Sequence, residues 1–144
     1  MSKKSPRIAE LLAGLPASEY DPHYLGYFVC FNRQLYFEAH DVLEQLWLAG
    51  GKVAPNYSFF KGLIQLAGAF VHLQKGRLRP AVALFRLTEA NLSIYPLDHA
   101  GLSLSGVLEL VHQWRGWVES GSFEVNPLGI HPAPRLLLKG VALV

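Results

Sequence analysis

The stretch "FNRQLYFEAHDVLEQLWLAGG", residues 31–51, decides the fold because it holds a turn signal followed by a complete amphipathic helix. Asn32 is the commonest non-glycine residue type at a left-handed helix end, so a tight turn is predicted at residues 32–34. Apolar side chains then recur at helical spacing from Leu35 to about Ala49, where a pair of glycines ends the helix. A single bent helix is the alternative interpretation.

Helical signals continue on both sides of this stretch. Upstream, Asp21 is a good N-cap and Pro22 suits the first helical position, so a helix is predicted from there to about Phe31. Downstream, residues 57–75 are apolar on nearly every side. A helix without a polar face is usually buried, so this segment, which we call the central helix, is predicted to be the most buried helix of the domain.

Two more helices complete the predicted fold. One is predicted to open at Pro80 and to end before Pro96, and the other to be capped by Ser103 or Ser105 and to stop at Gly121. No long alternating pattern of the kind that predicts a β-strand interrupts them. The chain is therefore predicted to be all-α, a compact bundle of five to six antiparallel helices with an extended C-terminal tail.

The predicted organisation has three parts. Residues 1–20 form an N-terminal leader with at most a short helix, and residues 21–121 form the helical bundle domain. Residues 122–144 form a tail that contains prolines and ends in "RLLLKGVALV". Because so apolar a strip is unfavourable in water, the tail is expected to dock on its own bundle or on a partner subunit. Docking on a partner would make the protein a homodimer.

Composition bounds the class of protein. The 144 residues are 51% hydrophobic and 17% charged, which is too apolar for a disordered chain. The most apolar run, "GLIQLAGAFVHLQ", is too short for a membrane span and is interrupted by Gln65 and His72. Glu10 interrupts the apolar patch near the start, so no signal peptide is predicted. The lone Cys30 excludes a disulfide framework and Cys-rich zinc sites. A cytoplasmic protein without a membrane partner is expected.

Four basic residues gather at the turn after the central helix, and we call them the basic corner: Lys75, Arg77, Arg79 and Arg86. One interpretation is an anion-binding or nucleic-acid-binding surface at a helix start. The other is a solvated corner in which Lys75 interacts with the end of the preceding helix. The net charge of only +2 and the absence of interleaved aromatic residues favour the solvated corner, so nucleic acid is not the expected partner.

His40 and Glu44 are the first candidate site residues. At about 100° per residue, their side chains lie about 40° apart on one helix face. Glu38 lies about 160° from His40 on the same count, so it can share a site with His40 only through another segment. The central helix offers a polar stripe with Gln65 and His72 on an otherwise apolar surface. Because an unpaired buried polar group costs about 1–3 kcal/mol, this stripe is expected to face a cleft or the His40/Glu44 pair.

These stretches together resemble a known family. The pattern combines an aspartate–proline start, Phe-Asn, Glu-Ala-His, Leu-Glu before Trp, and a Gly-Leu-Ile-Gln helix with a later histidine. It is similar to the family described as domain of unknown function 309, over about residues 20–95. The resemblance implies a small all-α protein and no known activity. The matching residues are Asp21, Pro22, Phe31, Asn32, Phe37, Glu38, Ala39, His40, Glu44, Trp47, Gly62, Gln65, His72 and Gly76.

This chain departs from the family pattern at three positions. Gln34 stands where the family usually has glycine, which bears on the tight turn. Asp41 replaces a glutamate, and Arg77 replaces an asparagine. These two changes alter the charge near any site and at the corner after the central helix.

Three hypotheses follow for function. In the first, the chain is a structural or interaction module with a buried polar network of Glu38, His40, Glu44, Trp47, Gln65 and His72. In the second, His40, Glu44 and His72 line a cleft that binds a small molecule or a metal ion. Such a cleft could be hydrolytic, with metal-activated water or with His40 and Glu44 as catalytic residues. In the third, the basic corner binds an anion. The sequence identifies no cofactor and does not decide whether the chain is an enzyme.

Overall fold

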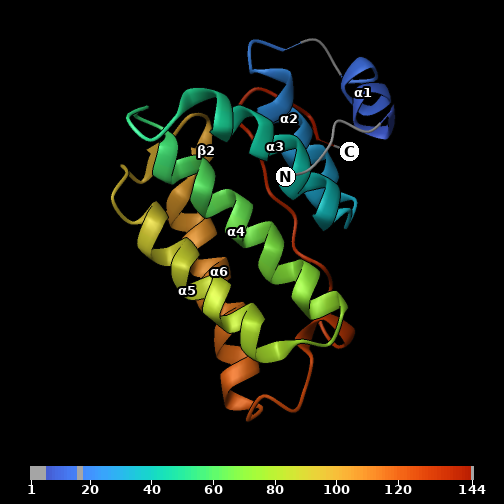
Figure 1. The fold of residues 1–144 in the computed structure, drawn as a ribbon. Helices are drawn as coiled ribbons and strands as arrows, with labels where there is room; N and C mark the ends of the chain where they lie inside the picture. The colour runs from blue at the N-terminus through green and yellow to red at the C-terminus, as the bar shows by residue number, and fades with distance from the viewer. Residues whose placement is uncertain (1–5, 16–17, 144) are drawn as a thin grey trace.

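The computed structural model describes residues 6–15 and 18–143, and six α-helices account for most of them (Figure 1). The described residues also form a two-stranded antiparallel hairpin, a short 3-10 turn and an isolated bridge between Leu138 and Val141. The all-α prediction is confirmed. The elements are α1 (Pro6–Ala13), α2 (Pro22–Asn32), α3 (Tyr36–Gly50), α4 (Tyr57–Gln74), α5 (Leu78–Leu92), β1 (Asp98–His99), β2 (Leu102–Ser103), α6 (Leu104–Ser120) and η1 (Pro127–Gly129).

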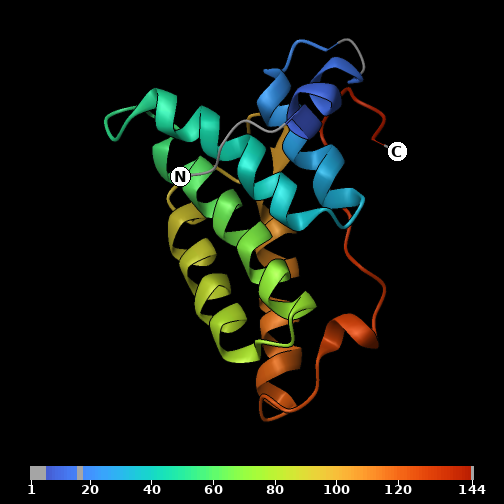
Figure 2. The same cartoon turned by 45° about the vertical axis from the view of Figure 1, so that its right-hand side comes forward.

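Helix α4 is the central helix of the bundle, but it is not the most buried one as predicted, because nine of its 18 residues are buried against nine of 11 in α2. It packs against α3 on one side and α5 on the other, while α2 packs on α3 and α6 on α5 (Figures 1 and 2). The Phe70 ring on α4 is fully buried and joins these layers through ring contacts. Its neighbours come from four helices and are Phe31, Tyr36, Phe85 and Trp114. No helix in the described part of the chain is long and apolar enough to cross a membrane.

The predicted tight turn between α2 and α3 is present, but a different residue makes it. Gln34, and not Asn32, has the left-handed conformation, with φ of 62°. The turn is closed by backbone hydrogen bonds from Gln34 N to Phe31 O at 3.0 Å and from Leu35 N to Cys30 O at 2.9 Å. Glutamine therefore replaces glycine here, although its side chain makes a left-handed conformation less favourable.

Asn32 instead holds the C-terminal tail. Its side-chain Nδ2 donates to Leu136 O at 2.8 Å, and its Oδ1 accepts from Leu136 N at 2.7 Å. Leu136 and Leu138 on either side of the exposed Leu137 are buried against the bundle. The tail runs back from the far end of the bundle towards α1 and α2 (Figures 1 and 2). In this structure the tail thus lies on its own bundle.

The N-terminal leader is described only in part. Helix α1 forms within it and buries Ile8, while residues 1–5 and 16–17 lie outside the described residues. Leu11 and Leu12 pack next to Gly26 of α2. The lack of a side chain at Gly26 therefore lets α1 approach α2.

Helix ends follow the predicted caps with one correction. Asp21 Oδ1 accepts from His23 N at 2.8 Å, and Ser103 Oγ accepts from Gly106 N at 3.3 Å, so both predicted N-caps are confirmed. Helix α5, however, begins at Leu78 instead of Pro80. Proline fits there because the N–H groups of a first helical turn have no partner within the helix to lose.

Candidate functional site

An open hollow lies where α3, α4 and α5 meet, and we call it the α3–α5 hollow. Its volume is about 270 Å³. Most of its wall is apolar, with two histidines and one glutamine as the exceptions. The lining residues are Phe37 and His40 from α3, Ile64, Gln65, Gly68, Val71 and His72 from α4, and Leu84 from α5.

Gly68 allows the hollow to form between α3 and α5. A Cβ atom added at Gly68 would lie 3.1 Å from Leu84 Cδ1, which is closer than an ordinary van der Waals contact. On the α3 side, the Phe37 ring stacks on the His40 ring with centroids 6.3 Å apart. Phe37 is 60% exposed, so the rim of the hollow presents an aromatic ring to solvent.

His40 enters the hollow without a hydrogen bond at its Nδ1 atom. This atom is buried and has no partner among the residues that the structure describes. The nearby carboxylate of Asp41 has its Oδ1 4.0 Å away, which is too long for a hydrogen bond. The side chain of Asp41 is itself mostly buried, so a negative charge lies close to the α3 side of the hollow.

His72 presents a second unpaired ring nitrogen. Its Nδ1 is also buried and has no hydrogen-bond partner in the described part of the chain. Burial lowers the pKa of His72, and the positive charges of Arg77 and Lys75 lower this pKa further. The ring is therefore neutral at pH 7, with one nitrogen able to donate a hydrogen bond and the other able to accept one.

Gln65 is tied to α5 instead of to the histidines. Its Oε1 accepts from Asn91 Nδ2 at 2.7 Å. One turn earlier on α5, Thr88 Oγ1 donates to Gly62 O at 3.2 Å. These two bonds fix α5 on α4 beside the hollow and orient the Gln65 amide.

The six predicted network residues do not all meet in one place. The structure brings His40, Gln65 and His72 to the α3–α5 hollow, whereas Glu38, Glu44 and Trp47 do not line it. The Trp47 ring contacts the Tyr57 ring at 5.3 Å, and the two glutamates are partly buried on α3. No three His, Cys, Asp or Glu side chains in residues 6–15 and 18–143 form a group that could hold a metal ion.

The basic corner divides into two pairs of cations. Arg79 lies over the Phe123 ring at 4.3 Å, and Arg86 forms an ion pair with Glu119. Lys75 and Arg77 are exposed and form no ion pair with a described residue. The charges of Lys75 and Arg77 lower the pKa of His72, so these two cations bear on the hollow.

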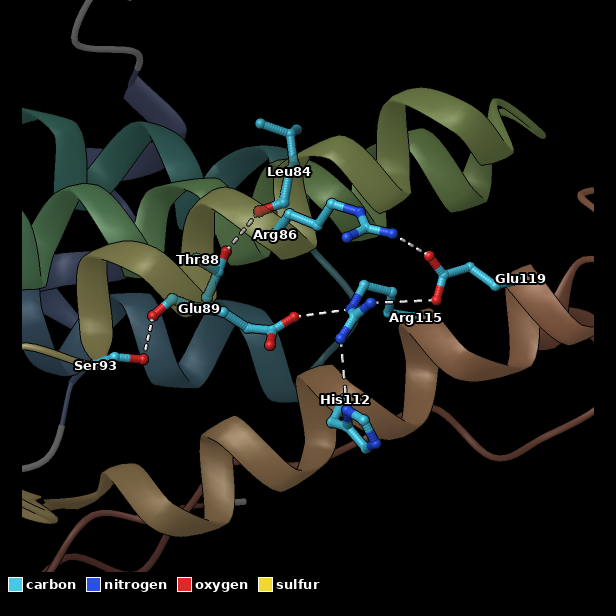
Figure 3. A network of polar contacts seen from close by, with 8 residues as sticks. All are labelled: Leu84, Arg86, Thr88, Glu89, Ser93, His112, Arg115 and Glu119. Carbon is cyan, nitrogen blue, oxygen red and sulfur yellow. Dashed lines mark hydrogen bonds and ion pairs between the residues drawn. The ribbon is translucent and has the colours of Figure 1, made fainter.

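A charged network between α5 and α6 was not predicted from the sequence (Figure 3). Arg115 Nε donates to Glu89 Oε1 at 2.8 Å, and its Nη1 donates to Glu119 Oε1 at 3.2 Å. Arg86 binds the other oxygen of Glu119, and His112 Nδ1 lies 3.5 Å from Arg115 Nη2. The i, i+4 spacing of Arg115 and Glu119 is a signal that sequence reasoning could have used. The partners on α5 carry no such signal.

Residues 24–84 match the model of the family described as "Domain of unknown function (DUF309)". The predicted resemblance to this family is confirmed over these residues. No match was found among curated proteins or among solved structures. The matched segment runs from α2 into α5 and contains every residue that lines the α3–α5 hollow.

Proposed function

We propose that the chain is a binding protein whose α3–α5 hollow takes a small organic molecule with an apolar body and a hydrogen-bonding group. The observation that supports this proposal is the pair of buried, unpartnered Nδ1 atoms on His40 and His72, which line the same apolar hollow. The proposal concerns binding and assigns no catalytic role to His40 or Glu44.

A structural brace and a binding site differ in whether their buried polar groups are paired. A polar network that serves only stability pairs its buried groups, because each unpaired one costs about 1–3 kcal/mol. Gln65 is paired in this way with Asn91, but the two histidine nitrogens are not. Their unmet hydrogen-bonding capacity is available to a molecule that enters the hollow.

The shape of the hollow supports a small ligand. Binding sites for organic molecules are mostly apolar and carry a few polar groups that orient the ligand, as this hollow does. Such sites usually measure about 300–1,000 Å³. At about 270 Å³, the α3–α5 hollow suits a molecule at the lower end of that range.

An interaction module is the second candidate, and the exposure of Phe37 favours it. A large aromatic ring that is 60% exposed beside an apolar hollow is typical of a surface that receives a partner's side chain. The two candidates use the same surface and differ in what fills it. A small molecule that binds without any partner protein would favour the first.

A fragment screen followed by protein NMR tests the proposal. We expect fragments with an apolar body and one polar group to shift the amide signals of Gly68 and His72. The variant Gly68→Leu should abolish these shifts, because the new side chain fills the hollow while leucine is a good helix former.

Gly116→Ala is the matched control, because a Cβ at Gly116 on α6 meets nothing within 4 Å. This variant should bind the same fragments as the wild type. The proposal is wrong if no fragment shifts the signals of the hollow, or if Gly68→Leu binds the fragments as well as the wild type does.

A further inference from the structure

We infer that the ligand of the α3–α5 hollow is a small monocarboxylate, aliphatic or aromatic, whose carboxylate faces Lys75 and Arg77 at the His72 end. This inference rests on the proposed function and names the class of ligand. It joins two features that lie apart in the sequence, the cations of the basic corner and the hollow.

Two of the four cations of the basic corner are available to a ligand. Arg79 lies over the Phe123 ring, and Arg86 is paired with Glu119, so both cations have partners. Lys75 and Arg77 have no acidic partner among the described residues. Free cations beside an apolar hollow are a means of recognising an anionic end group on an apolar molecule.

Lys75 and Arg77 lie at the His72 end of the hollow. The backbone N–H groups of Lys75 and Arg77 both donate to His72 O, at 3.1 and 2.8 Å. The two side chains therefore leave the chain directly beyond His72. Their charges reach its ring, since both lower the pKa of His72.

The C-terminus of a helix normally repels anions, and the end of α4 lies near the proposed position of the carboxylate. The last turn of α4 has its carbonyl oxygens occupied: Lys75 N donates to Val71 O at 3.2 Å, and Gly76 N donates to Leu73 O at 3.1 Å. Leu73 O also accepts from Asn126 Nδ2 at 2.6 Å. Pairing of these oxygens reduces the negative potential that an entering carboxylate would meet.

The charges and apolar side chains around the hollow favour one orientation of the ligand. Asp41 lies against His40, so the α3 side of the hollow repels an anion. Gly68 and the apolar side chains of Ile64, Val71 and Leu84 leave room for the body of the ligand. The carboxylate then lies near neutral His72, which can donate a hydrogen bond to it.

Calorimetric titration with a panel of short-chain and aryl carboxylates, each paired with its neutral amide, tests the inference. We expect the carboxylates to bind the wild type about tenfold more tightly than their amides, as a charge-assisted contact at a partly exposed site allows. The double variant Lys75→Gln/Arg77→Gln should lose this preference. Arg79→Gln/Arg86→Gln removes the same amount of charge and should keep it.

The outcomes separate the inference from the proposed function. Equal affinity for carboxylates and amides, both lost in Gly68→Leu, would overturn the inference and leave the proposed function standing. So would a panel in which only uncharged fragments bind. Equal loss of preference in both double variants would show a general charge effect and overturn the inference. If neither the carboxylates nor any other fragment binds, both fail.

Discussion

Helix α5 packs against α6 through charged side chains and against α4 along a seam that is closed at one end and open at the other. On the α6 side, Arg115 is paired with Glu89 and Glu119 (Figure 3). On the α4 side, the seam opens into the α3–α5 hollow, where the Nδ1 atoms of His40 and His72 have no partner among the described residues.

The two sides differ in what their polar groups accomplish. Charges that pair across α5 and α6 contribute to stability, because each group keeps a partner when the helices dock. Unpaired nitrogens in the hollow contribute nothing to stability by hydrogen bonding. This difference is the basis of the proposed function, in which polar groups between α5 and α6 serve the fold and those in the hollow serve a ligand.

The closed end of the α4–α5 seam offers the largest expected effect. A Cβ added at Gly62 would lie 2.8 Å from Leu92 Cδ2 and 3.0 Å from its Cγ, and Leu92 is fully buried. Gly62→Val must therefore separate α5 from α4, and we expect a loss of about 2–3 kcal/mol in the free energy of unfolding. Urea denaturation measures this loss.

The open end of the same seam supplies the comparison. Gly68→Ala places its new methyl group beside Leu84, which is partly exposed and can move. Its cost should be much smaller and offset by the gain in helix propensity of about 1 kcal/mol. Equal destabilisation by Gly62→Val and Gly68→Ala would show that the seam is closed along its whole length and that its two ends do not differ.

The charged network should show the next largest effect. Arg115→Ala leaves the carboxylates of Glu89 and Glu119 without their common partner. Because these groups are only partly buried, we expect a loss of about 1–2 kcal/mol in the free energy of unfolding. The loss should shrink in 1 M NaCl, where exposed charges are screened within a few ångströms.

Arg86→Ala is the matched control for this prediction. Arg86 contacts only Glu119 in the described network and is well exposed, so its removal should cost about 0.2–1 kcal/mol. If both substitutions lower the free energy of unfolding by the same amount, Arg115 is not the main stabilising residue of the network.

Local patterns made the helices predictable. Asp21 and Ser103 cap their helices as predicted, because capping depends on a side chain and the next three residues of the same segment. The start of α5 was placed two residues late, since proline is as compatible with the first turn of a helix as with its first position. Errors of this size are inherent in reading a helix end from local sequence.

Long-range contacts were harder to predict. Asn32 was assigned to the turn, yet its amide binds Leu136, which is 104 residues further along the chain. The helical count did place Gln65 and His72 on one stripe, and the structure brings both to the hollow together with His40. Whether such groups pair with one another depends on the distance between helices. Between α4 and α5 that distance is set at Gly62 and Gly68, which lie against Leu92 and Leu84 of a different segment of the chain.

The smallest expected effect belongs to His72 and is a matter of sign as much as of size. Its Nδ1 is buried without a hydrogen bond to lose, so His72→Leu should not lower the free energy of unfolding at pH 7.5 and should raise it, by up to about 1 kcal/mol. A brace would instead lose about 1–3 kcal/mol by the same change. Urea denaturation beside Arg115→Ala makes the comparison direct.

The pH dependence gives a second, independent reading of the same side chain. The pKa of His72 is lowered in the folded protein by burial and by Arg77 and Lys75, while the unfolded chain keeps the ordinary value of about 6.5. Above that value both states are neutral at this residue, and His72 contributes no pH dependence. As the pH falls below it, the unfolded state takes up a proton that the folded state resists, so wild-type stability decreases. His72→Leu removes this contribution, and between pH 7.5 and 5.5 it should lose less stability than the wild type. A steeper loss in the variant would mean that His72 gains a proton and a partner on folding, which places it with the paired groups of the α5–α6 network.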